Sequence, residues 1–211
     1  MKAVVSLVAV CLVVAALSAC ARKAPPKEKG ALDEQTQAPT AKAAHWGYVG
    51  GKVVTRADAE VKNTPDKALY LTEHYSMTAY RIPLANGNYA VKLHFAETYD
   101  KIDAPGQRVF TVAVEGKPVL ADLDVFQEAG KQRLAAVVRD CEVEVADGEL
   151  TIEFTPKVQN AMINAIEVRA KRAGRATGAA LLINCGAEQD YEAKDGRIWR
   201  KDQEYQGIPP T

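Results

Sequence analysis

Apolar and polar residues alternate with a period of two through most of the chain after Arg81, and this pattern limits the fold more than any other feature of the sequence. Segments with this alternation last about as long as ordinary β-strands. In the clearest of them, every second residue from Tyr89 to Phe95 shares one apolar face. Four further segments have the same character: residues 109–114, 141–145, 150–154 and 163–168. Since no stretch keeps a 3.6-residue period between helix caps, the pattern predicts an all-β antiparallel sandwich.

Glycine-containing turns separate these segments. Asn86-Gly87 precedes the strand that contains Tyr89, and Asp147-Gly148 stands between two alternating runs. Asn-Gly and Asp-Gly are strong hairpin signals because the turn needs positive φ, which glycine adopts without steric cost. The sequence therefore predicts β-hairpins at both places.

The first nineteen residues have the layout of an export signal. Lys2 precedes an apolar run that ends at Ala16, which is too short to span a bilayer comfortably. Leu-Ser-Ala-Cys at residues 17–20 resembles the lipobox of bacterial lipoproteins, and this resemblance implies that Cys20 carries diacylglycerol after cleavage. A second acyl chain would make the anchoring stable, because each buried methylene contributes roughly 0.8 kcal/mol. An ordinary secretory signal or a membrane anchor is the alternative.

Residues 20–44 contain the lipidated cysteine and a linker rich in Pro, Ala, Lys and Gln. With almost no large apolar side chain, this segment cannot repay the entropy of ordering, so it is predicted to be a flexible tether. The remaining residues, 45–211, are enough for a single domain. Ala21 and Arg22 follow the cysteine without an aspartate, and this favours an outer-membrane location facing the periplasm or the cell surface.

Charge and cysteine content exclude several functions. Lys plus Arg and Asp plus Glu number 27 each among 211 residues, so no positive field gathers phosphates and nucleic acid is not expected as a partner. Cys141 and Cys185 lie in the predicted domain without a Cys-x-x-Cys motif or a histidine pair, so neither a metal site nor another cofactor is expected. An exported chain meets an oxidising compartment, so these two cysteines either form a disulfide or stay as two small apolar side chains.

An ordered set of motifs is similar to the malectin family. The chain contains Leu-Tyr-x-Thr-Glu-x-Tyr at residues 69–75 and Leu-His-Phe-Ala-Glu-Thr-Tyr at residues 93–99. Further family segments follow in order: residues 108–110, 116–120, 123–125 and 164–168. The resemblance implies a lectin-type β-sandwich, or jelly roll, that binds glucose-containing oligosaccharides through aromatic residues on loops at one end.

The same resemblance implies a set of carbohydrate-binding residues. Family tyrosines correspond to Tyr48, Tyr75 and Tyr99, while Asp100 stands where the family often has an aromatic residue and Gln159 or Asn160 where it has an acidic one. An aromatic ring stacks on the C–H face of a pyranose while amides and carboxylates bond its hydroxyls. The six residues predicted to bind carbohydrate are Tyr48, Tyr75, Tyr99, Asp100, Gln159 and Asn160.

The order of the family segments is rotated in this chain. Malectin modules usually begin with a strand like Ile-Asn-Cys-Gly, followed by Asp-Gly-x-x-Trp and Asp-x-x-Tyr. Here these segments stand at the C-terminus, at residues 183–186, 195–199 and 202–205. A circular permutation is therefore expected, in which residues 181–207 supply the opening strand and loop and bring Trp199 and Tyr205 near Trp46 and Tyr48. A truncated second repeat is the alternative.

Three functions are compatible with the sequence. The first is non-catalytic carbohydrate binding at the cell envelope, and the second is a protein-interaction or scaffold domain that has lost sugar binding. A glycoside hydrolase would need two carboxylates, for which Glu97 with Asp122 or Asp124 are the candidates. Glu97 has a simpler explanation as an acceptor of backbone N–H groups at a strand end, so an enzyme is not expected.

Overall fold

The computed structural model describes residues 46–172 and 175–206, so the predicted signal, Cys20 and the tether lie outside the described residues. Short strands dominate this part of the chain, and none of the helices within it is long and apolar enough to cross a membrane. The elements in the first half are β1 (Gly47–Val49), β2 (Lys52–Thr55), the 3-10 helix η1 (Lys67–Tyr70), β3 (Thr72–Tyr75), β4 (Ala79–Pro83), β5 (Gly87–Phe95), β6 (Val109–Val114) and β7 (Lys117–Leu123). The second half contains α1 (Val125–Glu128), β8 (Val137–Val145), β9 (Glu149–Val158), β10 (Met162–Ile163), β11 (Ala165–Arg172), β12 (Arg175–Asn184), β13 (Tyr191–Glu192) and β14 (Ile198–Lys201).

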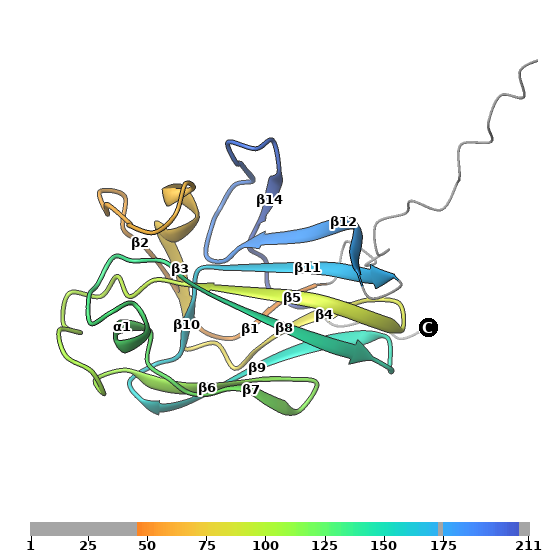
Figure 1. The fold of residues 1–211 in the computed structure, drawn as a ribbon, viewed down its shortest axis with the longest axis horizontal. Coiled ribbons are helices and arrows are strands. Elements are labelled where there is room, and N and C mark those ends of the chain that lie inside the picture. Colours follow the sequence, from red (N-terminus) through yellow and green to blue (C-terminus); the bar gives the residue numbers. More distant parts are fainter. Residues whose placement is uncertain (1–45, 173–174, 207–211) are drawn as a thin grey trace, which may run out of the picture. The chain divides into compact units, whose positions relative to one another are not determined.

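The strands form three sheets, and the predicted antiparallel β-sandwich is confirmed (Figure 1). One sheet has the order β1-β4-β9-β6-β7, and the largest has the order β13-β14-β12-β11-β5-β8. A small sheet of order β10-β3-β2 lies at one end. Apart from the parallel pair β12–β14, the strand pairs are antiparallel.

The main core follows from the alternation of the strands. Every second residue of β5 from Tyr89 to Phe95 is buried, and the matching residues of β4, β6, β9 and β11 meet them from the other sheet or from the neighbouring strand. The fully buried members include Tyr80, Ile82, Phe110, Val112, Ile152 and Ile166. A period of two therefore produces one dry face on each of the two large sheets.

The two predicted hairpins are wrong. The strands on either side of Asn86-Gly87, β4 and β5, belong to different sheets, and so do β8 and β9 on either side of Asp147-Gly148. Gly148 still has positive φ (88°), as the turn chemistry requires. The chain crosses between sheets because β5 pairs with β8 and β11 while β4 pairs with β9, which buries both apolar faces. Consecutive strands do pair elsewhere, for example β6 and β7, which form a hairpin through Glu115 and Gly116.

A second apolar cluster covers one end of the outer face of the six-stranded sheet. Leu69 and Tyr70 of η1 and Trp199 of β14 pack there, against Leu182 of β12. Beneath them, the ring of His94 lies edge-on to Trp199 with centroids 5.5 Å apart, and its Nδ1 is 3.0 Å from the hydroxyl of Tyr70. Burial lowers the pKa of His94 to about 4.

The lowered pKa of His94 makes stability depend on pH. The unfolded chain binds the proton at His94 below about pH 6.5 and the folded domain only below about pH 4, so the contribution of His94 to the free energy of unfolding should fall as the pH drops between these values. The full effect is about 3 kcal/mol. Urea titrations at several pH values should show that the difference in free energy of unfolding between the wild type and His94→Gln decreases as the pH drops from about 6.5 to about 4. A difference that does not change with pH would contradict this assignment.

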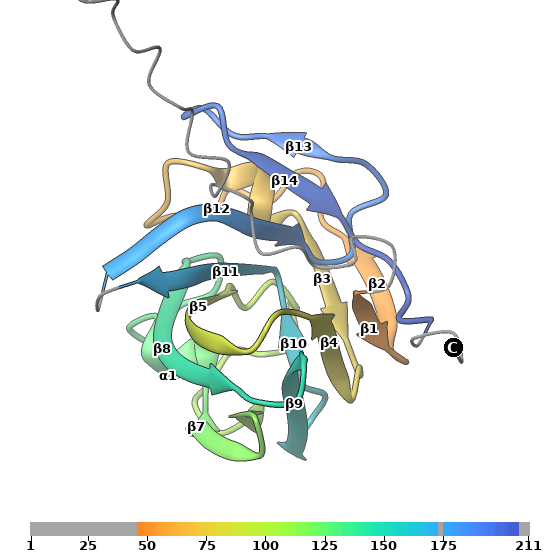
Figure 2. The same ribbon diagram turned by 90° about the vertical axis from the view of Figure 1, so that its right-hand side faces the viewer.

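The C-terminal segment folds back onto the same domain. β12 pairs with β11, β14 runs parallel to β12, and in Figure 2 β14 and β13 lie beyond β12 at the end of the sheet. The backbone of Tyr48 accepts a hydrogen bond from the amide of Tyr205 and donates one to the carbonyl of Gln203, each 2.9 Å long. A Cβ atom on Gly47 would lie 2.3 Å from that same carbonyl oxygen, so this close approach requires glycine. Tyr205 therefore lies where it was predicted to, but Trp199 packs on His94 in the second cluster and not beside Trp46.

Asp202 joins the C-terminal segment to the centre of the domain. Its Oδ2 atom accepts hydrogen bonds from the hydroxyl of Tyr80 (2.8 Å) and the amide of Gly186 (2.6 Å), and it lies 2.8 Å from Nδ1 of His74. The Nε2 atom of His74 is 3.1 Å from the carbonyl oxygen of Gly50. The side chains of His74 and Asp202 are only 1% and 4% exposed, so this network is dry.

Cys141 and Cys185 do not form the disulfide considered above, because both thiols are free. Cys141 lies on β8 at the edge of the six-stranded sheet, and Cys185 follows β12, from which β8 is separated by β11 and β5. Neighbouring strands lie about 4.8 Å apart, whereas disulfide-bonded residues have Cα atoms within about 7 Å. Burial raises the pKa of the Cys141 thiol to about 11.

Candidate functional site

A cavity of about 230 Å³ opens where the small sheet meets two loops. Four of the six predicted carbohydrate-binding residues line it together: Tyr75, Tyr99, Gln159 and Asn160. The other lining residues are Val54, Arg56, Glu73 and Arg108. Two aromatic rings, two amides and three charged groups therefore face one space.

The small sheet positions one wall of the cavity. Glu73 and Tyr75 lie two residues apart on β3, so their side chains share one face of the strand. β3 is held between β2 and β10, with Tyr75 opposite Lys52 on one side and Met162 on the other.

The loop between β9 and β10 forms another part of the lining. The amide of Ser76 donates a hydrogen bond of 3.0 Å to the carbonyl of Ala161, which ties this loop to the end of β3. Gln159 has positive φ (58°), a conformation that costs energy in a residue with a side chain and that often marks a binding site. The fold therefore maintains a strained residue at the rim of the cavity.

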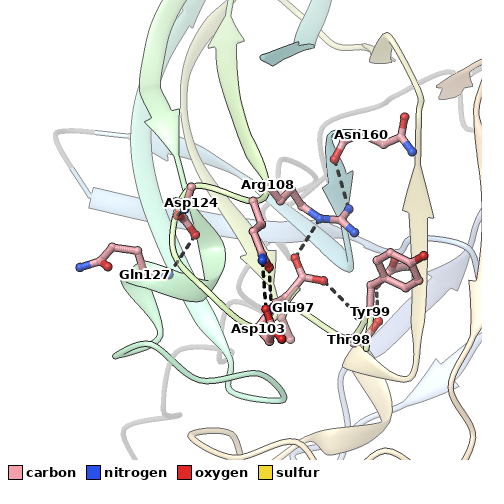
Figure 3. Close-up of polar contacts among 12 residues, drawn as sticks. Glu97, Thr98, Tyr99, Asp103, Arg108, Asp124, Gln127 and Asn160 are labelled. Atoms are coloured by element: carbon pink, nitrogen blue, oxygen red, sulfur yellow. Dashed lines mark hydrogen bonds and ion pairs between the residues drawn. The ribbon is translucent and has the colours of Figure 1, made fainter. Parts of the chain in front are cut away.

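A buried ion pair supports the floor of the cavity. Nε of Arg108 lies 2.8 Å from Oε2 of Glu97, and Arg108 also donates a hydrogen bond of 3.1 Å to the carbonyl of Asn160 (Figure 3). The other oxygen of Glu97 accepts a 3.0 Å hydrogen bond from the amide of Tyr99, so the predicted role of Glu97 as a backbone acceptor is confirmed. Burial raises the pKa of Glu97 to about 7, although Arg108 and the Tyr99 amide act against this shift. Glu97 and Arg108 thus hold Tyr99 and Asn160 in place from behind.

Glu73 is the carboxylate that faces the cavity. The hydroxyl of Thr98 donates a 2.5 Å hydrogen bond to its Oε2 atom, which fixes the orientation of the side chain. Burial raises the pKa of Glu73, while the Thr98 hydroxyl and the charges of Arg108 and Arg56 lower it. A fixed carboxylate with remaining lone pairs can accept hydrogen bonds from ligand hydroxyls.

The structure does not bring Tyr48 and Asp100 to this cavity. The ring of Tyr48 packs 4.1 Å from that of His74, centroid to centroid, and the residue contributes to the main core. Asp100 is exposed and lies one residue beyond Tyr99, outside the lining of the cavity. The predicted set is therefore divided: four residues share one site, and these two lie elsewhere.

Sequence analysis missed Arg56, Glu73 and Arg108 as lining residues. Arg56 stands in a segment with no recognisable motif, and Arg108 reaches the cavity from the start of the sixth strand. Glu73 lies inside the Leu-Tyr-x-Thr-Glu-x-Tyr motif, two residues before Tyr75, and strand periodicity would have placed both on one face. The two-residue spacing between Glu73 and Tyr75 was the signal in the sequence that could have identified Glu73 as a lining residue.

The carboxylates considered for hydrolysis do not assemble around the cavity. Asp122 pairs with Lys157 on the surface of the five-stranded sheet. Asp124 caps α1 by accepting a 2.9 Å hydrogen bond from the amide of Gln127, and it accepts another from Gly106. Across residues 46–172 and 175–206, no group of three or more His, Cys, Asp or Glu side chains is arranged to hold a metal ion.

Known proteins with similar sequences share this domain. Receptor-like protein 4 of Arabidopsis thaliana is 44% identical over 84 residues, which are 39% of this chain and 13% of that protein. Human malectin is 33% identical over 106 residues, which are 44% of this chain and 36% of malectin. The chain therefore spans well under half the length of these relatives.

Solved structures agree with the fold. A β-glucuronidase of Bacteroides uniformis superposes with a TM-score of 0.55 and 25% identity, covering 60% of this chain and 14% of that enzyme. The ANX1 ectodomain of Arabidopsis thaliana gives a TM-score of 0.54 over 65% of this chain and 43% of the ectodomain, at 16% identity, and so supports the fold alone. The profile of the malectin domain matches residues 25–177, which is most of the chain. The protein belongs to the malectin domain family, whose members are carbohydrate-binding β-sandwich modules.

Proposed function

We propose that the cavity binds one sugar ring of a carbohydrate and that this is the function of the domain. The observation that carries the proposal is the meeting of Tyr75 and Tyr99 with Glu73 and Asn160 around one small space. Tyrosine rings cover the apolar C–H face of a pyranose, while the carboxylate and the amide bond its hydroxyls. Membership of a carbohydrate-binding family supports the same conclusion.

The size of the cavity sets the expected ligand and affinity. Its volume of about 230 Å³ is below the roughly 300–1,000 Å³ of clefts that hold drug-sized ligands, so it accommodates one ring and leaves the rest of an oligosaccharide outside. With few contacts, the dissociation constant should lie between micromolar and millimolar, or roughly 4–8 kcal/mol of binding free energy.

Removing either tyrosine ring should weaken binding. Tyr75→Ala and Tyr99→Ala each lose about 1–2 kcal/mol of stacking, so we expect roughly a five- to thirtyfold weaker affinity for a glycan that the wild type binds. Glycan-array screening of the purified protein would identify that glycan, and calorimetry would measure the change. Tyr191→Ala, on β13 outside the cavity, is the control and should bind like the wild type. Wild-type affinity in both cavity variants would place the site elsewhere, and a chain that binds no glycan would favour the scaffold function.

We propose binding without hydrolysis. Glycoside hydrolysis generally requires two carboxyl groups on either side of the bond that breaks. Among residues 46–172 and 175–206, Glu73 is the only carboxylate that lines the cavity, and Glu97 is occupied by Arg108 and the Tyr99 amide. Although one structural relative is a β-glucuronidase, the chain covers only 14% of that enzyme. Release of reducing sugar from a bound glycan would overturn this proposal.

We further propose that the domain is displayed at the cell envelope on a lipid anchor at Cys20, as the lipobox-like segment before it indicates. Cys20→Ser should abolish lipid labelling and shift the protein from the membrane fraction, because the thiol is the acceptor. Metabolic labelling with a fatty-acid analogue, followed by fractionation, measures both effects. Unchanged labelling of the variant would disprove the anchor, while Cys141→Ser provides a matched substitution in the folded domain.

A further inference from the structure

Arg56 is the cation of the cavity that has no carboxylate partner. Its guanidinium lies 6.0 Å from the centre of the Tyr99 ring, and its backbone amide is fixed by a 2.6 Å hydrogen bond to the carbonyl of Leu71. Its Nε atom is buried and has no hydrogen-bond partner among the described residues. Within this part of the chain, Arg56 lies within ion-pair distance of no Asp or Glu, unlike Arg108, which is paired with Glu97.

Of the three charged side chains that line the cavity, Arg56 and Glu73 have no ion-pair partner among the described residues. Arg108 and Glu97 compensate each other beneath the floor, at 2.8 Å. Glu73 is fixed by Thr98 and keeps acceptor capacity toward the cavity. A complementary ligand therefore carries a carboxylate for the guanidinium and hydroxyl groups for Glu73 within the space of one ring.

We infer that the cavity selects a uronic acid residue, that is, a sugar ring with a carboxylate at C6, over the corresponding neutral sugar; this inference rests on the proposed function. A carboxylate matches the flat guanidinium through two parallel N–H···O bonds, a fit that neutral hydroxyls do not offer. The single negative charge also matters, because Glu73 nearby would repel a doubly charged phosphate more strongly. Stacking on Tyr99 orients the guanidinium before the ligand arrives, so little entropy is lost on binding.

The test compares matched pairs of ligands on the purified full-length protein in detergent. The methyl glycosides of glucuronate and glucose, and of galacturonate and galactose, are titrated while binding is monitored by calorimetry. We expect at least one uronate to bind about tenfold more tightly than its neutral partner, because a hydrogen bond to a charged group contributes roughly 1.5–3 kcal/mol. This preference should shrink at high salt, which screens the charge of the partly exposed guanidinium.

Two arginine variants connect the preference to one residue. Arg56→Gln should remove the preference for uronate, so that the dissociation constants of the uronate and of its neutral partner become about equal. Arg81→Gln is the matched control, because Arg81 also lies over a tyrosine ring, that of Tyr205 at 5.7 Å, but outside the cavity. Arg56→Lys keeps the positive charge but lacks the planar guanidinium and its paired N–H donors, so it should give an intermediate preference for uronate. Thermal melting of each variant verifies that the fold is intact.

The outcomes separate this inference from the proposed function. Tighter binding of uronate that depends on Arg56 supports both. Equal or weaker binding of uronate relative to the neutral sugar overturns the selection but leaves sugar binding standing. A preference that survives in Arg56→Gln also overturns the assignment. If the protein binds none of the four glycosides and none of the oligosaccharides built from them, the inference and the proposed function are both overturned.

Discussion

A chain that ends at residue 178 is expected to lose the cooperative unfolding transition of the domain. The deletion removes most of β12 and all of β14, and with them Leu182, Ile183 and Trp199, which are at most 4% exposed. Each such side chain contributes roughly 1.5–3 kcal/mol when buried, against a total stability of about 5–15 kcal/mol for a typical domain. β11 would in addition lose its partner on one side, which leaves a row of unpaired backbone groups in the middle of the sheet.

Circular dichroism and urea titration measure this outcome. The reference is a chain that ends at residue 206 and so retains every strand described above. The point variant Gly47→Ala probes the same junction without truncation, since its new methyl group would meet the backbone of residues 203–205 within 2.3–2.6 Å.

The deletion also tests our proposal that the domain is circularly permuted. Adjacent ends are what a permutation requires, and Tyr48 exchanges backbone hydrogen bonds with residues 203 and 205. The match to the malectin domain ends at residue 177, before the segment that supplies β14. A truncated protein that melts like the reference would refute the permutation and favour a broken second repeat.

Asp202→Ala should lower the free energy of unfolding by about 3–5 kcal/mol, the largest effect expected from one substitution here. The change leaves His74, the Tyr80 hydroxyl and the Gly186 amide without their shared acceptor in a dry environment. Removing one member of a buried, hydrogen-bonded pair costs this much because the other member stays buried and uncompensated.

Urea titration at neutral pH measures the loss, and two variants interpret it. Asp202→Asn keeps the shape and one acceptor oxygen, so it should be destabilised less than Asp202→Ala. Asp195→Ala removes an exposed aspartate from the same segment, where it pairs with Arg197 on the surface, and should be destabilised far less than Asp202→Ala. If Asp202→Ala unfolds at the same urea concentration as Asp195→Ala, the network does not stabilise the domain.

Local patterns predicted the strands well but not their partners. The alternation of apolar and polar residues located β5, β6, β8, β9 and β11, because a strand with one buried face has an apolar side chain at every second residue. Asp147-Gly148 was read as a hairpin because the turn requires positive φ, which Gly148 has. Turn chemistry does not determine which strand lies alongside, since that depends on how β5 and β4 bury their faces in opposite sheets.

The candidate site was predicted in part for a similar reason. Motifs grouped Tyr75, Tyr99, Gln159 and Asn160 as one set, and the structure gathers these four around one cavity. Tyr48 belongs to a motif too, but its ring fills the space beside His74 in the core. Arg56 could not be recognised, because a lone arginine in a sequence does not reveal whether a carboxylate will lie near it once the chain has folded.

The pairing of β1 with residues near the C-terminus also determines when folding can finish. The chain leaves a ribosome or an export channel from its N-terminus, so Tyr48 emerges long before Gln203 and Tyr205, the residues that bond its backbone. Contacts between residues so far apart in sequence form late and slowly, because the long intervening loop must close first. Until the last strand is available, β11 and β1 present open edges to other chains. We therefore expect a chain built in this way to aggregate more readily than one whose first and last strands do not pair, until its last strand has been made.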